Sequence, residues 1–152
     1  MSKLLCNKTR QILKDQLARH EGIKLTPYFC TANKLTIGIG RNLEQKGISL
    51  EEADTLLDND VSQFEQEVYN KVDKEMGINL LSINDERRAV LINMAFNLGV
   101  NGLCKFKNML SAIKKHDYEL AAKEMLNSRW ATQVGDRADE LAQIMRTGKW
   151  TG

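Results

Sequence analysis

The stretch from Ser49 to Gly77 constrains the fold of this chain more than any other part of the sequence. Its apolar residues recur at the spacing of one helix face, at Ala53, Leu56, Leu57, Val61, Phe64, Val68, Val72 and Met76. Ser49 and Glu52 form a Ser-x-x-Glu capping box, which marks the start of a helix. A helix of about 25 residues is roughly 35–40 Å long. Such a rod is too long for one small core, so we predict that a helix over 50–76 joins two lobes of a single domain spanning 1–152.

The predicted first lobe, at about residues 9–60, contains a β-hairpin. Residues 35–40 alternate between large apolar side chains and small or polar ones, with the period of a strand. Residues 28–30 are the expected partner strand. The alternation places Thr36 on the face away from the apolar one, where Gly38 and Gly40 leave room for a close approach. A helix is expected over 7–20, and this N-terminal helix can pack on the helical lobe.

The predicted second lobe, at about residues 77–150, is helical. Residues 84–98 are apolar on nearly every side, which is typical of a helix at the centre of a core, and Gly99 is expected to end it. Three shorter helices are expected over 106–115, 117–127 and 136–146, and both Trp130 and Trp150 are expected in the core. A small β lobe and a helical lobe give an α+β fold class.

Composition narrows the classes of function. The chain has 152 residues, a net charge of +2, 42% hydrophobic and 28% charged residues, as in ordinary globular proteins. The net charge is too small to imply nucleic-acid binding, although it suits a mildly basic protein that acts on a polyanionic surface. No window resembles a signal peptide or a membrane span, so stable membrane insertion is not expected. The three cysteines, Cys6, Cys30 and Cys104, form no Cys-x-x-Cys pair, so we expect free thiols, a reducing cytoplasm and no metal site.

Glu21, Cys30 and Thr36 are candidate catalytic residues. Glu21 lies at the C-terminal end of the first helix, where the negative end of the helix dipole favours the protonated acid that a general acid needs. Thr36 can hold a water through its hydroxyl, and Cys30 on the neighbouring strand can reach the same space. This pattern fits hydrolysis of a glycosidic bond. The residue types alone favour a simpler alternative without catalysis. In it, Glu21 is a solvated residue at a helix end, Cys30 is a small buried residue and Thr36 is an ordinary strand residue.

The spacing of these three residues resembles the Glu-eight-Asp/Cys-five-Thr motif of phage lysozymes, glycoside hydrolase family 24. Flanking segments agree in the same order over about residues 9–150: His20-Glu21-Gly22, Leu35 to Gly40, Arg87-Arg88-Ala89, Leu91 to Gly99, Ser128-Arg129-Trp130, Arg137-Ala138 and Arg146 to Trp150. The resemblance implies a lysozyme-like fold, with a small N-terminal lobe containing the β-hairpin, a long connecting helix and a helical C-terminal lobe.

The resemblance also implies residue roles in a muramidase that cuts the β-1,4 bond between N-acetylmuramic acid and N-acetylglucosamine. Glu21 would protonate the leaving oxygen, while Thr36 and Cys30 would position a water for attack with inversion. Direct attack by a Cys30 thiolate is the alternative and predicts retention. Arg137 corresponds to the arginine that pairs with the catalytic glutamate. Phe96 and Asn97 correspond to the segment lining the cleft and are candidate substrate-binding residues, although Phe96 fits a core position equally well.

An endolysin of this kind acts on peptidoglycan as a monomer, without a cofactor or a bound metal. The expected route is synthesis in the host cytoplasm, then release by a holin to the periplasm and cell wall. Two alternatives remain: a lytic transglycosylase, which cleaves the same bond without water, and a non-catalytic cell-wall-binding or virion structural protein.

Overall fold

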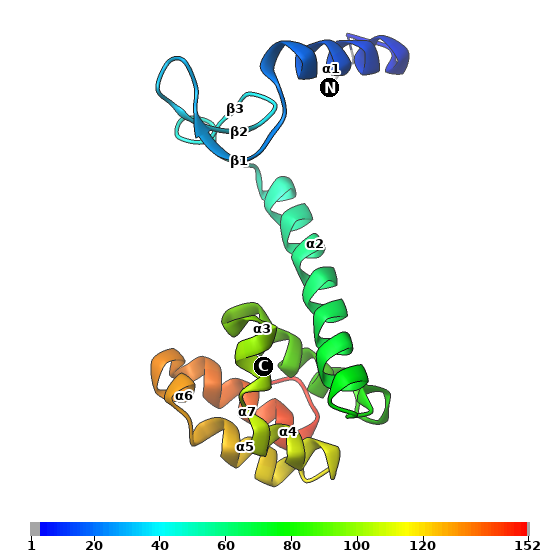
Figure 1. The fold of residues 1–152 in the computed structure, drawn as a ribbon, viewed down its shortest axis with the longest axis vertical. Helices are drawn as coiled ribbons and strands as arrows, with labels where there is room; N and C mark the ends of the chain where they lie inside the picture. Colours follow the sequence, from blue (N-terminus) through cyan, green and yellow to red (C-terminus); the bar gives the residue numbers. More distant parts are fainter. Residues whose placement is uncertain (1–3, 152) are drawn as a thin grey trace. The chain divides into compact units, whose positions relative to one another are not determined.

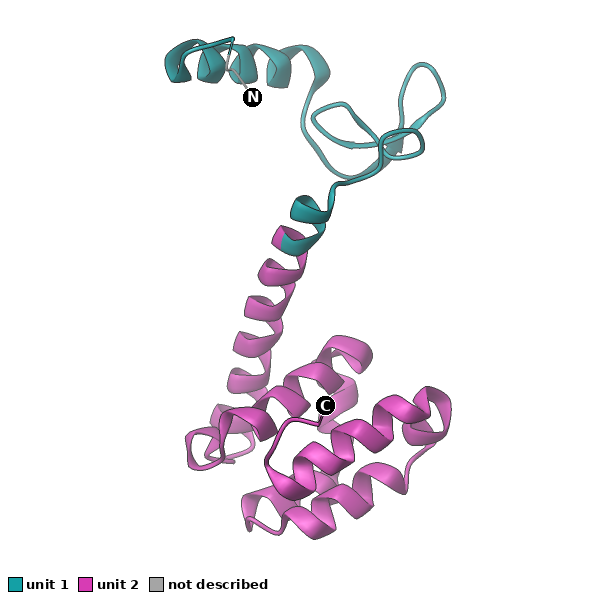
Figure 2. Cartoon of the chain, turned by 180° about the vertical axis from the view of Figure 1, so that it is seen from behind, with its two compact units in different colours: residues 1–54 teal, residues 55–152 magenta. Residues whose placement is uncertain are grey.

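A computed structural model describes residues 4–151 of the chain, which divides into two compact units, residues 1–54 and residues 55–152 (Figure 2). The first unit holds a helix and a small sheet. The second contains helices and no strands in its described part.

The first unit begins with helix α1 (Asn7–Glu21), as the sequence predicts (Figure 1). Cys6 is the N-cap: its Sγ accepts a hydrogen bond from the backbone N–H of Thr9 at 3.5 Å. A sulfur is an uncommon acceptor at this position, where hydroxyl and carboxylate oxygens are preferred, so the role of Cys6 had no signal in the sequence. Gly22 ends the helix at φ 78°, with its N–H bonded to the carbonyl of Ala18.

A three-stranded antiparallel sheet follows, in the order β1-β2-β3. Its strands are β1 (Lys24–Phe29), β2 (Leu35–Gly38) and β3 (Arg41–Asn42). The predicted hairpin is therefore confirmed. The third strand was not predicted, because two residues are too few to show a period. Thr36 lies at the centre of the sheet, opposite Tyr28 on one side and Asn42 on the other.

The burial of β2 is the reverse of the prediction. Thr36, at 4% exposure, is the one buried residue among the described residues 4–54, whereas Leu35 and Ile37 are half-buried and Ile39 is 47% exposed. Its hydroxyl donates a 2.7 Å hydrogen bond to the carbonyl oxygen of Lys34. A buried hydroxyl needs such a partner, and this bond satisfies it. The expected arrangement, apolar side inward and Thr36 outward, is wrong for this strand.

The long helix is present. Its first part, α2 (Leu50–Val68), begins with the predicted capping box: the N–H of Glu52 donates to Ser49 Oγ at 3.1 Å, and the N–H of Ser49 donates to Glu52 Oε1 at 2.9 Å. The helix continues as the π-helical segment η1 (Tyr69–Glu75). Helical structure therefore covers almost all of the predicted 50–76 span, with a wider winding in its last turns.

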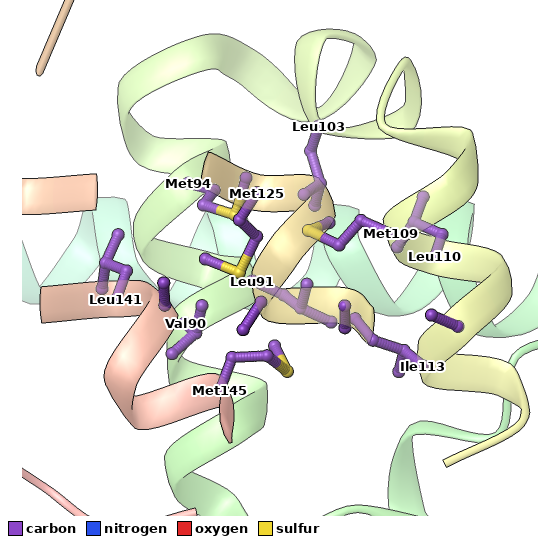
Figure 3. Packing of buried hydrophobic residues seen from close by; sticks show 14 of the residues in the cluster. Val90, Leu91, Met94, Leu103, Met109, Leu110, Ile113, Met125, Leu141 and Met145 are labelled. Atoms are coloured by element: carbon purple, nitrogen blue, oxygen red, sulfur yellow. The ribbon is translucent and has the colours of Figure 1, made fainter. Parts of the chain in front are cut away.

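The second unit packs its helices around one apolar core. Figure 3 shows Leu91 and Met94 of the central helix in one cluster with Leu110, Met125 and Met145 from other helices. All of the buried apolar residues in the described chain, from Val68 to Met145, belong to this cluster. The other helices of the second unit are η2 (Leu80–Ser82), α3 (Asp85–Cys104), which is the central helix, α4 (Lys107–Lys114), α5 (Tyr118–Leu126), α6 (Arg129–Val134) and α7 (Asp136–Thr147).

Two details of the helical unit differ from the prediction. Helix α3 is broken at Gly99, which has φ 76°, but helical turns resume and run to Cys104. Helix α6 was missed because six residues do not display a helical period, although Ser128 is a regular N-cap that accepts from the N–H of Ala131 at 3.1 Å. Trp130 is buried as predicted, at 4% exposure, whereas the prediction for Trp150 is wrong, since it is 64% exposed.

In the part of the chain that the structure describes, no single helix has both the length and the apolar composition of a membrane span. Helices α3 and α4, which are bent by 95° relative to each other, reach that length and apolar composition only when they are taken together.

Candidate active site

Cys30 and Thr36 meet at the turn between β1 and β2. The turn is closed by two backbone hydrogen bonds, from the N–H of Cys30 to the carbonyl of Lys34 at 3.0 Å and from the N–H of Asn33 to the carbonyl of Cys30 at 2.8 Å. Asn33 takes the left-handed conformation, with φ 58°. Tyr28 pairs with Thr36 across the two strands, so Cys30, two residues after Tyr28, is the diagonal neighbour of Thr36. Two of the three candidate catalytic residues are therefore neighbours in space.

Backbone amides make the Cys30 thiol more acidic. Hydrogen bonds from the backbone of Lys34, and next from that of Ala32, lower the pKa of Cys30 from its ordinary value, and the Thr36 hydroxyl adds a smaller effect. Thr36 has only one hydroxyl proton, and the Lys34 carbonyl receives it. We therefore assign the lowered pKa mainly to the two backbone groups, which stabilise the thiolate.

The Glu21 carboxylate lies against Gly40, in the turn that joins β2 and β3. A Cβ placed on Gly40 would be 3.0 Å from Glu21 Oε2 and 3.3 Å from Glu21 Cδ. The side chain of Glu21 thus occupies the space that a side chain at position 40 would need. The open approach predicted for the small-residue face is confirmed at Gly40, whereas at Gly38 nothing lies within 4 Å.

Glu21, the last residue of α1, contacts the hairpin that carries Cys30 and Thr36. Gly40 is two residues from Asn42, the cross-strand partner of Thr36. Both the Glu21 carboxylate and Thr36 therefore lie against the segment formed by β2, β3 and the turn between them.

An ion pair fixes the strand that follows the Gly40 turn. Arg41 Nη1 donates to Glu52 Oε1 at 2.8 Å and to the carbonyl of Gly47 at 3.2 Å, and Arg41 Nη2 lies 2.8 Å from Glu52 Oε2. The hydrogen bond from Arg41, followed by that from the Ser49 backbone, lowers the pKa of Glu52 to about 2. This bidentate pair was missed by the sequence analysis. The only signal for it was a glutamate in a capping box, which predicts a cap rather than an ion pair.

In the second unit, Arg137 is held by a neighbouring helix. Its Nε and Nη2 donate to Asn93 Oδ1 at 3.0 and 2.7 Å, and Nη2 also reaches the Asn93 carbonyl at 3.3 Å. Asn93 had not been singled out from the sequence. Its position one helical turn from Phe96 and Asn97 on α3 was the available signal.

Phe96 and Asn97 have different surroundings. Phe96 is 43% exposed and packs on Phe64, with ring centroids 5.4 Å apart. Asn97 Oδ1 accepts a 2.8 Å hydrogen bond from the indole N–H of Trp130. Asn97 is thus engaged in supporting a core residue, and its NH₂ group is the part of the side chain left to contact a ligand.

A pocket of about 410 Å³ in the second unit brings Phe96 and Arg137 together. Its other lining residues are mostly apolar: Leu57, Val61, Ala89, Ile92 and Asn93. A larger hollow of about 670 Å³ in the same unit, between α2, α3 and Trp150, contains none of the predicted site residues. The larger of these two hollows is therefore not the one that contains the predicted residues.

Among the described residues, no group of three or more His, Cys, Asp or Glu side chains is arranged to hold a metal ion. The three candidate residues, Glu21, Thr36 and Cys30, offer one carboxylate, one hydroxyl and one thiol. These groups can donate a proton and hold a water, which are the two tasks of a hydrolytic glycosidase.

Comparison with known proteins agrees with this chemistry. Residues 18–146 match the family model of phage lysozyme. The chain is 30% identical over 161 aligned positions to the probable T4-type lysozyme 2 of Dictyostelium discoideum, covering 90% of this chain and 94% of that protein. It is 28% identical over 162 positions to the probable T4-type lysozyme 1 of the same organism, with the same coverage.

A third relative has a different architecture. The pre-baseplate central spike protein Gp5 of Enterobacteria phage T4 is 30% identical over 161 positions, which cover 90% of this chain but only 28% of the spike protein. The shared part is thus a minor portion of that protein. The family model covers most of the present sequence, including all three residues of the hairpin site and Arg137. On this evidence, the chain belongs to the phage lysozyme family of glycoside hydrolases.

Proposed function

We propose that this lysozyme hydrolyses the β-1,4 bond between N-acetylmuramic acid and N-acetylglucosamine, with Glu21 as the general acid. The observation that carries the proposal is the hairpin itself, with the Glu21 carboxylate against Gly40 at its turn and Thr36 beside Cys30 further along. Membership of the family supplies the substrate, peptidoglycan.

The hydrogen bonds of Thr36 determine how a water would be held. Because its proton is donated to the Lys34 carbonyl, Thr36 Oγ1 presents lone pairs and accepts a hydrogen bond from the water. The half-buried Cys30 provides the second acceptor, since backbone amides favour its thiolate form. With two hydrogens engaged in this way, the water directs a lone pair of its oxygen toward the anomeric carbon.

The reaction then proceeds as one displacement. Glu21 gives its proton to the glycosidic oxygen as the carbon–oxygen bond breaks, and the water oxygen bonds to the anomeric carbon from the opposite face. The water gives the proton that it shares with Cys30 to the thiolate, which becomes a thiol, and Glu21 is left ionised. Exchange with solvent then returns a proton to Glu21 and removes one from Cys30. The product has an inverted anomeric centre. Attack by the Cys30 sulfur would instead form a covalent intermediate and end in retention.

The test uses purified peptidoglycan. Wild type should release reducing ends, and Glu21→Gln should reduce the rate by a factor of about 10² to 10⁴, because the leaving oxygen loses its proton donor. NMR of freshly released sugar ends should show inversion. Cys30→Asp should remain active and inverting, whereas activity that persists in Glu21→Gln would disprove the assignment of the acid.

Two other activities give different results in these assays. A lytic transglycosylase would release 1,6-anhydro ends in place of reducing ends. A non-catalytic virion component, suggested by the likeness to part of a phage spike protein, would bind the cell wall and leave the turbidity of permeabilised Gram-negative cells unchanged.

In its biological setting, we propose that the protein acts as a monomeric endolysin. It would be made in the host cytoplasm and reach the periplasm and cell wall after a holin opens the membrane. Expression in a host with and without a holin tests this route, since lysis should require both proteins.

A further inference from the structure

The position of the Glu21 carboxylate depends on a residue that has no side chain. Gly40 presents its α-carbon to Glu21, and the nearest carboxylate oxygen, Oε2, lies 3.0 Å from where a Cβ would stand. Such a contact is tighter than most real Cβ contacts, so a side chain at position 40 would push the Glu21 carboxylate away by a few tenths of an ångström. Glu21 is also the last residue of α1, where no further helical turn holds its side chain in place.

The Gly40 turn is itself held on its C-terminal side. The next residue, Arg41, contacts both carboxylate oxygens of Glu52 and the carbonyl of Gly47. Glu52 is fixed in turn by the capping box with Ser49 at the start of α2. A bidentate guanidinium–carboxylate pair constrains direction as well as distance. The chain of contacts therefore runs from the first turn of α2, through Arg41, to the α-carbon on which Glu21 rests.

We propose that Gly40 is a positioning residue for Glu21, and that the Arg41–Glu52 ion pair holds Gly40 in the place where the carboxylate can lie against it. The proposal rests on the assignment of Glu21 as the general acid. It extends that assignment by identifying the residues that determine where the acid lies. A displacement of about 1 Å in a reacting group can cost on the order of 10²-fold in rate.

The chain contains a matched control for this proposal. Gly38 and Gly40 both have φ +70°, a conformation that L-residues rarely adopt. Alanine at either position therefore suffers the same backbone strain. Only at Gly40 does the new methyl group meet Glu21, because nothing lies within 4 Å of a Cβ at Gly38. The difference between the two variants isolates the contact with Glu21 from the strain.

The experiment measures kcat and KM on soluble peptidoglycan fragments for wild type, Gly38→Ala, Gly40→Ala and Glu21→Gln. Thermal melts verify that each variant is folded at the assay temperature. We expect similar losses of Tm in the two alanine variants. Gly40→Ala should have a kcat about tenfold or more below that of Gly38→Ala at a similar KM. Equal kcat values in the two alanine variants, with Glu21→Gln inactive, would overturn the proposal while leaving the general acid intact.

A second pair of variants decides the matter if Gly40→Ala does not fold. Arg41→Gln removes the ion pair near the turn, and Arg146→Gln removes the comparably exposed Arg146–Glu119 pair of the second unit. Arg41→Gln should lower kcat severalfold with KM little changed, Arg41→Lys should recover part of the loss, and Arg146→Gln should affect only Tm. Equal kcat in Arg41→Gln and Arg146→Gln would overturn the proposal. Full activity of Glu21→Gln would overturn the proposed function as well.

Discussion

The indole N–H of Trp130 donates a 2.8 Å hydrogen bond to Oδ1 of Asn97. Trp130 is 4% exposed, and its ring also packs nearly perpendicular to that of Phe106, at a centroid distance of 5.8 Å. Asn97 therefore supplies the acceptor that a buried indole requires. This contact gives Asn97 a structural task in addition to the substrate contact that the family resemblance implies.

Replacing Asn97 with Leu should destabilise the protein by about 1–3 kcal/mol, because the Trp130 N–H would be buried without an acceptor. Chemical unfolding followed by tryptophan fluorescence measures the change. Asn97→Asp is the control, since it retains an acceptor oxygen and should lose less. Equal stability of Asn97→Leu and wild type would show that the hydrogen bond contributes nothing net.

Replacing Asn93 with Ala should reduce activity severalfold with little change in Tm. Asn93 Oδ1 orients the guanidinium of Arg137 through two short contacts, and its loss leaves only the longer contact of Arg137 with the Asn93 backbone carbonyl. Reducing-end release and thermal melts give the two readouts. If Arg137 has no part in the reaction, Asn93→Ala and wild type will have the same kcat.

Cys30 should react with iodoacetamide at a lower pH than Cys104. Backbone hydrogen bonds from Lys34 and Ala32 lower the pKa of Cys30, whereas burial raises the pKa of Cys104. Because the thiolate is the reactive form, the pH at which alkylation accelerates follows each pKa. Mass spectrometry of variants retaining one cysteine each would measure the two profiles. Coincident profiles would contradict the prediction.

The Arg41–Glu52 pair should make stability depend on pH in the acid range. The pKa of Glu52 is lowered from 4.5 to about 2, so the folded state holds the carboxylate ionised where the unfolded chain would protonate it. This contribution is fully present above about pH 4.5 and is lost as the pH falls toward 2. Tm should therefore drop by a few degrees more in wild type than in Glu52→Gln over that range. Glu75→Gln, which breaks the exposed Lys71–Glu75 pair, is the comparison and should follow wild type closely.

The sequence predicted the long helical elements best. The capping box at Ser49 and Glu52 located the start of α2 to the residue, because reciprocal hydrogen bonds of that kind are local. The hairpin was also predicted, since a period of two is visible even over six residues. The short elements β3 and α6 were missed, because neither is long enough to show a period.

The sequence identified the residues of the candidate site, but it did not predict which contacts these residues make. The motif spacing named Glu21, Cys30 and Thr36, but the burial of Thr36 and its bond to Lys34 depend on a central strand and a tight turn that sequence patterns do not specify. Gly40 was expected to allow a close approach. Only the structure shows that Glu21 is the residue that lies close to Gly40.

The distribution of buried residues has a consequence for dissecting the protein. Every buried apolar side chain among the described residues lies at or beyond Val68, while residues 4–54 bury only Thr36. A peptide comprising residues 1–54 would lack the hydrophobic driving force that offsets chain entropy, and so would remain unstructured when cut from the rest. The hairpin is thus not a transplantable module, and a minimal enzyme must retain the helices that supply the buried apolar residues.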